Sequence, residues 1–112
     1  MDERTRQFLK TAAWLFMRHG QKARALGVCA ALNEDDPSDP VSACAYAQLL
    51  LEGGNPAKAL KAISAAGSEA DIEHASAVLE TRALAELGRK SEARSRWRRH
   101  LESMKGPSRK WM

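Results

Sequence analysis

Apolar residues recur along this chain at spacings of three and four positions, which is the period of an amphipathic α-helix. Near the C-terminus, Ala93, Trp97, Leu101 and Met104 follow one another at intervals of four, four and three residues. A helix over about residues 5–18 is predicted near the N-terminus. Its apolar stripe consists of Phe8, Leu9, Ala12, Ala13, Leu15 and Phe16. Alanine is abundant and strand-favouring Val, Ile and Thr are sparse, so the pattern predicts an all-α protein with six helices.

Three similar segments divide the chain at equal intervals of 34 residues. Each has a glycine followed five positions later by an alanine: Gly20 and Ala25, Gly54 and Ala59, Gly88 and Ala93. Glycine can adopt the left-handed backbone that ends a helix, and a small alanine lets two helices approach closely. A period of 34 is that of a tetratricopeptide repeat, a helix–turn–helix unit. We predict three such repeats over about 6–39, 40–73 and 74–107, stacked as a short solenoid in one domain, 1–107, with a flexible basic tail over 108–112.

Turn and capping residues agree with these boundaries. Pro37 lies where the first repeat should stop, because proline does not continue a helix. Asp39 is expected to cap the third helix, with Pro40 in its first turn, and Asn55 with its following proline repeats the arrangement at the fourth. Ser68 is expected to cap the fifth helix.

Charge is distributed unevenly along the chain. Ten Lys/Arg and three Asp/Glu from Arg82 onward give a balance of +7, whereas eight Lys/Arg and eleven Asp/Glu before it give −3. Such asymmetry indicates nucleic acid, anionic lipid or an acidic protein as partner. Since Trp97 is expected to face the core, no aromatic residues would alternate with the arginines of the last helix, as binding of single strands requires. Nucleic-acid binding through this helix is therefore the weaker alternative.

The first helix of each repeat is expected to line a concave face. Equivalent positions along these helices predict an apolar partner-binding groove with scattered polar points. Its residues are Lys10, Trp14, Met17, Cys44, Gln48, Leu51, Val78, Arg82 and Ala85. Trp14 and Met17 are the expected anchors, because aromatic and flexible side chains dominate peptide contacts. The alternative for Trp14 is packing in the core of its own hairpin.

No residue pattern indicates catalysis. The three histidines, His19, His74 and His100, are scattered without the spacing of metal ligands, and no glycine-rich phosphate loop occurs. Cys29 and Cys44 lie in apolar contexts and are expected to be buried thiols. We therefore expect no enzymatic activity, no cofactor and no metal. No apolar run of about 18 residues occurs and the opening residues do not look like a signal peptide, so a cytoplasmic protein without membrane insertion is expected.

Two stretches carry a family resemblance. The first is Arg6-Gln7-Phe8-Leu9 followed by Trp14-Leu15 and Gly20, and the second is Ala93-Arg94-Ser95-Arg96-Trp97 continuing to Leu101-Glu102. With the repeats, they resemble small tetratricopeptide chaperones of bacterial type III secretion systems, in particular those of the YscY kind. The resemblance implies a cytoplasmic bacterial chaperone that binds a small secreted partner of the YscX kind as a heterodimer and helps present it to the export gate. Needle-subunit chaperones of the same systems and a general tetratricopeptide scaffold are the alternatives.

Overall fold

The computed structural model describes residues 1–105, and this part of the chain is helical apart from its turns and loops. Its six α-helices and one short 3-10 helix confirm the predicted all-α class. They are α1 (Glu3–Arg18), α2 (Lys22–Asp35), α3 (Pro40–Glu52), α4 (Pro56–Ala65), η1 (Ala70–Ile72), α5 (Glu73–Glu86) and α6 (Lys90–Met104). The predicted tail over 108–112 and the end of the third predicted repeat lie outside the described residues.

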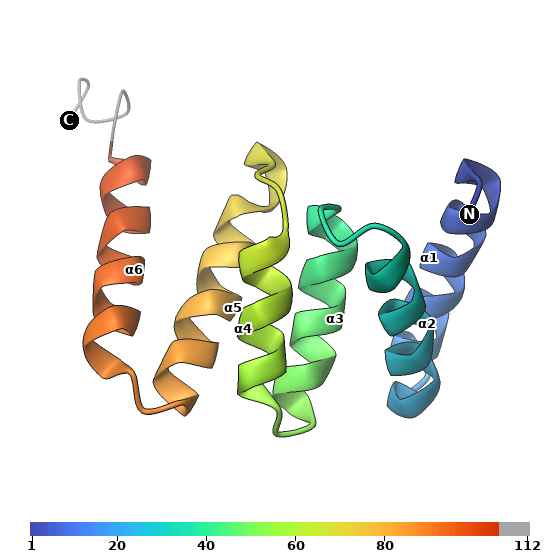
Figure 1. Ribbon diagram of the computed structural model, residues 1–112, viewed down its shortest axis with the longest axis horizontal. Coiled ribbons are helices and arrows are strands. Elements are labelled where there is room, and N and C mark those ends of the chain that lie inside the picture. The colour runs from blue at the N-terminus through green and yellow to red at the C-terminus, as the bar shows by residue number, and fades with distance from the viewer. Residues whose placement is uncertain (106–112) are drawn as a thin grey trace.

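Consecutive helices pair into hairpins, α1 with α2, α3 with α4 and α5 with α6. The hairpins join through α2 against α3 and α4 against α5, and α3 also contacts α5. Figure 1 shows the result as a row of helices in which α1 and α6 stand at opposite ends. The helices at the two ends therefore have fewer helical neighbours than those in the middle. Among residues 1–105, no helix combines the length and the apolar character that crossing a membrane requires.

The three repeated glycines close the three hairpins in the same way. Gly20, Gly54 and Gly88 have φ of 75°, 80° and 80°, the left-handed region in which a side chain is unfavourable. In each turn the amide after the glycine donates to a carbonyl of the preceding helix, which satisfies one of the open groups at its end. The bonds are Gln21 N to Phe16 O at 2.8 Å, Asn55 N to Leu50 O at 2.8 Å and Arg89 N to Leu84 O at 2.9 Å. The predicted role of these glycines is confirmed, and Ala25, Ala59 and Ala93 are buried as expected.

Side-chain caps explain where α3 and α4 begin. The Asp39 carboxylate accepts a hydrogen bond from the Val41 amide at 3.2 Å, and the Asn55 side chain accepts one from the Lys58 amide at 3.4 Å, so both predicted caps are confirmed. The predicted cap at Ser68 is wrong, because α5 begins only at Glu73, after η1.

The loop before η1 is tied to the loop between α2 and α3. The amide of Gly67 donates to the carbonyl of Ser38 at 2.8 Å, a contact that sequence spacing does not reveal. The chain is then extended at Glu69, with φ of −147°, before it enters η1. This tertiary contact delays the start of α5.

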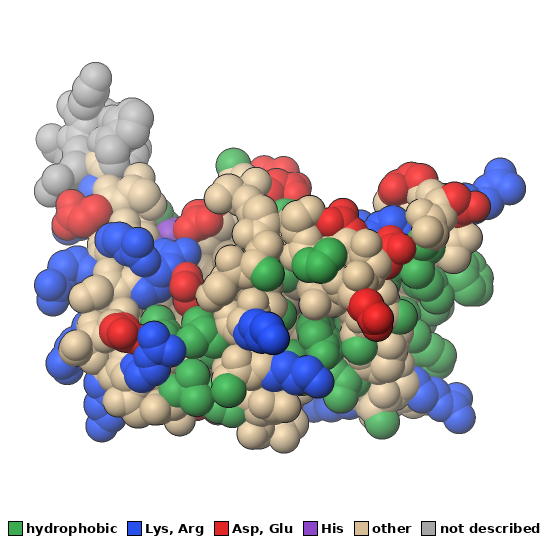
Figure 2. All heavy atoms as spheres, viewed as in Figure 1, with side chains coloured by type: hydrophobic (Ala, Val, Ile, Leu, Met, Phe, Trp, Pro, Cys, Tyr) green, Lys and Arg blue, Asp and Glu red, His purple; other side chains and the backbone are tan. Residues whose placement is uncertain are grey.

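The predicted apolar stripe of α1 is only partly buried. Ala13 is buried, and Phe16 is half-buried against the core. Phe8 and Leu15 are exposed instead, Phe8 by 70%, and Figure 2 shows green hydrophobic side chains along this outer edge. No other helix of the described chain covers this side of α1, since it is the first of the row.

Candidate partner-binding groove

An open apolar cavity of about 240 Å³ lies between α1 and α3. It is lined by Lys10, Ala13, Trp14 and Met17 of α1, Cys29 and Leu32 of α2, and Val41, Ser42 and Ala45 of α3. We call this cavity the α1–α3 groove. Three hairpin-forming helices contribute to it, so its shape depends on how the first hairpin packs against the second.

Trp14 stands at the mouth of the α1–α3 groove. Its side chain is 56% exposed, which excludes the alternative that it is a core residue of its own hairpin. The guanidinium carbon of Arg18 lies 5.2 Å from the centre of its ring, in a cation–π contact. Met17 beside it is half-buried against the core. A large aromatic surface is thus held in a defined place and left open to a ligand.

An ionic cluster holds α1 to the start of α3 at one end of the groove. Arg6 is buried and contributes both of its terminal nitrogens, while Lys10 and Ser42 add further contacts to the same carboxylate of Asp39. The contacts are Arg6 Nη1 to Asp35 Oδ2 at 2.6 Å, Arg6 Nη2 to Asp39 Oδ2 at 2.9 Å, Lys10 Nζ to Asp39 Oδ2 at 3.0 Å and Ser42 Oγ to Asp39 Oδ2 at 2.7 Å. Because Arg6 and Lys10 belong to α1 and Asp39 caps α3, these contacts join the two helices that form the walls.

The same cluster determines the charge state of Asp39. Burial by itself would raise the pKa of this carboxyl group. The hydrogen bond from Ser42 and the contacts with Lys10 and Arg6 outweigh that effect and lower the pKa to about 2. Asp39 is therefore ionised throughout the physiological range, and together with Asp35 it balances the charges of Arg6 and Lys10.

The two cysteines are not arranged for chemistry. Both are free thiols. Burial raises the pKa of Cys29, and burial together with the negative charge of Glu73 raises the pKa of Cys44. Since the thiolate is the reactive form, neither side chain has the character of a nucleophile. Cys29 instead forms part of the apolar surface of the groove.

Three of the nine predicted groove residues line this cavity: Lys10, Trp14 and Met17. Outside it lie the predicted positions Cys44 and Gln48 on α3 and Val78, Arg82 and Ala85 on α5. Cys44 is half-buried and the other four are exposed, with Arg82 paired to Glu86 at 2.8 Å.

The prediction of Leu51 as a groove residue is wrong. This side chain is only 3% exposed and belongs to the core, because α3 is covered by α2, α4 and α5. The α3 wall is made instead by Val41, Ser42 and Ala45, about one turn nearer the start of the helix. The positions 34 residues earlier are Gln7, Phe8 and Thr11, and none of them lines the groove. The repeat pattern therefore does not predict the wall positions on α3.

The chain matches no protein-family model, no curated protein and no solved structure. What the α1–α3 groove can do follows from its chemistry. Its walls are apolar and its mouth is open, with Trp14 exposed there and stacked by Arg18. Lys10, the cation in its lining, is already paired with Asp39. Such a surface suits an apolar segment of another molecule better than a charged ligand.

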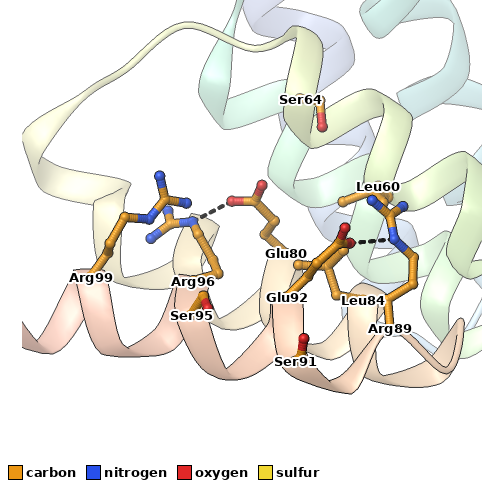
Figure 3. Close-up of a pocket in the computed structure, with 10 residues that line it drawn as sticks. All are labelled: Leu60, Ser64, Glu80, Leu84, Arg89, Ser91, Glu92, Ser95, Arg96 and Arg99. Carbon is orange, nitrogen blue, oxygen red and sulfur yellow. Dashed lines mark hydrogen bonds and ion pairs between the residues drawn. The ribbon is translucent and has the colours of Figure 1, made fainter.

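The arginines of α6 do not form one basic stripe. Arg96 is paired with Glu80 and, at 3.0 Å, with Glu73. Figure 3 shows Arg96 and Arg99 on the wall of a cavity between α4, α5 and α6, with Arg96 reaching Glu80. Arg94 and Arg98 line a different cavity. The basic end seen in Figure 2 is thus divided between two surfaces.

The second of these cavities corrects the expectation for Trp97. It has a volume of about 350 Å³ and is lined by Thr81, Ala93, Arg94, Trp97, Arg98 and Leu101. We call it the α6 end groove. Trp97 is half-buried and forms part of its wall, so the prediction that it faces the core holds for only part of the ring. An aromatic ring does lie between two arginines here, contrary to the sequence-based argument.

Two of the scattered histidines meet in space. His74 Nδ1 lies 3.0 Å from His100 Nε2, and both rings contact Trp97. His100 is buried, which makes this group part of the packing between α5 and α6. In residues 1–105, no three His, Cys, Asp or Glu side chains are grouped so that they could hold a metal ion.

Proposed function

We propose that this chain is a chaperone built from three stacked tetratricopeptide-like repeats, which shields an apolar segment of another polypeptide in the α1–α3 groove. The observation that carries the proposal is the position of Trp14. A tryptophan exposed by more than half is costly in water, and here it borders an open apolar cavity. Such aromatic anchors contribute most of the binding free energy in many interfaces.

The assignment of the repeats rests on the three turns. The 34-residue interval between Gly20, Gly54 and Gly88 recurs with the same positive φ and the same closing hydrogen bond. These features support a short solenoid of equivalent units. In such arrays the first helix of each unit faces the ligand, and α1 and α3 are the helices that form the groove walls.

The partner that we propose is a small secreted protein of the YscX kind, bound as a heterodimer in the bacterial cytoplasm and passed to the export gate. This part of the proposal rests on the resemblance to YscY-like chaperones. A needle subunit is the alternative client, and a scaffold outside secretion is the alternative role. Neither the groove nor its contacts call for a catalytic reaction, so we propose binding alone.

The test is co-expression of the chain with small secreted proteins of the YscX kind, followed by co-purification and titration calorimetry. We expect Trp14→Ala to weaken binding by about tenfold or more, as loss of an aromatic anchor does. Val41→Asp should weaken binding similarly, because it places a charge in the apolar wall. Aspartate is favourable in the first turn of a helix, so α3 should remain folded.

The matched control is Phe8→Ala, which removes an exposed aromatic ring from the same helix but outside the groove. Its affinity should stay within about twofold of that of the unaltered chain. Equal binding by Trp14→Ala, Val41→Asp and Phe8→Ala would refute the groove as the binding site. Binding of needle subunits alone would favour the alternative client.

A further inference from the structure

The α6 end groove is formed mainly by residues of α6, the helix that stands at the opposite end of the row from α1 (Figure 1). Its floor is apolar and consists of Ala93, Trp97 and Leu101 of α6, with Thr81 of α5 at the side. Arg94 and Arg98 stand one helical turn apart at its edge and are exposed. Neither arginine makes an ion pair within residues 1–105.

The inner hairpins show what covers the equivalent surfaces of α4 and α2. Ala93 and Trp97 correspond, at 34-residue steps, to Ala59 and Ile63 of α4. Those two side chains are buried where α5 packs against α4. Ala93 is buried as well, but Trp97 is only half-buried, whereas its equivalent Ile63 is buried. On α2 the equivalent alanine and Cys29 are likewise buried, with α3 packed against the helix. The α6 end groove is therefore a surface against which one more helix can pack. Residues 1–105 contain no helix in that place.

The register of that helix can be inferred from the contact of α4 with α5. Leu60 and Ser64 of α4 line one cavity together with Glu80 and Leu84 of α5 (Figure 3). Because adjacent helices here run in opposite directions, Leu60 lies toward Leu84 and Ser64 lies toward Glu80. A helix seated on α6 as α5 is seated on α4 would bring the positions equivalent to Leu84 and Glu80 to the two arginines.

The arginines are specific to this last surface. Arg94 and Arg98 stand where α4 has Leu60 and Ser64 and where α2 has Leu26 and Ala30. At the inner interfaces these uncharged side chains meet another helix of the chain. On α6, two guanidinium groups beside an apolar floor complement carboxylates that are spaced one turn apart on an amphipathic helix.

We propose that the α6 end groove docks an acidic amphipathic helix of a partner protein. The apolar face of that helix covers Trp97 and Leu101, and its carboxylates pair with Arg94 and Arg98. A nucleic acid fits less well, because Arg96 is paired with glutamates and Arg99 faces another cavity. The cations of α6 thus do not follow the continuous track that a phosphate backbone needs. This docking site is independent of the proposed chaperone groove.

The probe is a peptide of residues 73–86 with Leu84→Glu, which carries glutamates at positions 80 and 84. A hydrocarbon staple joins positions 78 and 82, which are exposed in α5, and keeps the peptide helical. The full chain carries Trp14→Phe and Trp111→Phe, so that its fluorescence reports on Trp97 alone. We expect the acidic peptide to bind and to shift the Trp97 emission to shorter wavelengths as the ring becomes covered.

Charge reversal tests the arginines. Arg94→Glu with Arg98→Glu should weaken binding of the acidic peptide by about tenfold or more. The same variant should then prefer a peptide with lysines at positions 80 and 84. The control is Arg24→Glu with Lys61→Glu, which changes the net charge equally at two other exposed positions and should bind as the unaltered chain does. Circular dichroism checks that every variant keeps its helicity.

Four results would overturn the proposal. The first is no binding of the acidic peptide, or equal binding of the acidic and lysine peptides by the unaltered chain. The second is a shift of the Trp97 emission to longer wavelengths when residues 106–112 are deleted, which would make this segment the occupant. The third is self-association that Arg94→Glu with Arg98→Glu abolishes, which would make a second copy the occupant. The fourth is tighter binding of a single-stranded oligonucleotide than of the acidic peptide at physiological salt.

Discussion

Replacing Asp39 by asparagine removes one negative charge from the ionic cluster that joins α1 to α3. The substitution keeps the size of the side chain, and asparagine caps helices about as well as aspartate does. The start of α3 should therefore persist. What is lost is the carboxylate that accepts from Ser42 and pairs with Arg6 and Lys10. The change in stability consequently reports on the charge of Asp39 in the folded chain.

The magnitude follows from the pKa of Asp39, which falls from its ordinary value of 3.8 to about 2 in the folded chain. Since each pKa unit corresponds to about 1.4 kcal/mol, ionised Asp39 stabilises the folded chain by about 2 kcal/mol at neutral pH. Between about pH 4 and pH 2 the unfolded chain binds more protons than the folded one at this site. The stabilisation is therefore complete above the unfolded pKa and is lost as the pH falls through the folded pKa.

The assay is urea denaturation followed by far-ultraviolet circular dichroism, for the unaltered chain and Asp39→Asn, at several pH values between neutral and strongly acidic. We expect Asp39→Asn to lower the free energy of unfolding by about 2 kcal/mol at neutral pH and by much less below about pH 2. Asp71→Asn is the control, because Asp71 is exposed and makes no ion pair within residues 1–105. It should change stability by less than about 0.5 kcal/mol. A loss for Asp39→Asn that is the same at every pH would refute the electrostatic reasoning.

The remaining predictions concern single side chains. Gly54→Ala should cost about 1–2 kcal/mol, because a Cβ there meets no atom within 4 Å and the cost is that of φ at +80°. Gly27→Ala should instead stabilise α2 by about 0.5–1 kcal/mol, since the site is equally open but helical; urea midpoints that move in the same direction would contradict this pair. Leu51→Ala should lower the free energy of unfolding by about 2–5 kcal/mol, because it truncates a core side chain. An unchanged urea midpoint would contradict the burial of Leu51.

Features that depend on neighbours in sequence could be predicted well. The turns at Gly20, Gly54 and Gly88 need only a left-handed residue after a helix, and the caps at Asp39 and Asn55 need only an acceptor before one. The cap at Ser68 failed because a contact with the preceding loop intervenes. Local chemistry is sufficient when the partner groups lie within a few residues of each other.

The candidate site was predicted less completely, and the reason lies in the ends of the helical row. Equivalent positions in a repeat share a direction on their helices, but they do not share neighbours. Met17 and Leu51 illustrate this difference, since they lie 34 positions apart. Met17, on the end helix α1, is half-buried and lines the groove, whereas Leu51, on the enclosed α3, is buried. The pairing of Arg6 with Asp39 was also missed, because it joins residues 33 positions apart.

The amino-acid pattern was therefore enough to establish the helical class, the three hairpin turns and most helix starts, because each of these depends on interactions within a few residues. Other features depended on the assembled fold. They are the exposure of Trp14, the burial of Leu51, the ionic cluster at Asp39 and the α6 end groove beside Trp97. Burial is a property of how many neighbours cover a residue. In a row of helices, that number changes from the ends to the middle even where the repeated sequence positions are equivalent.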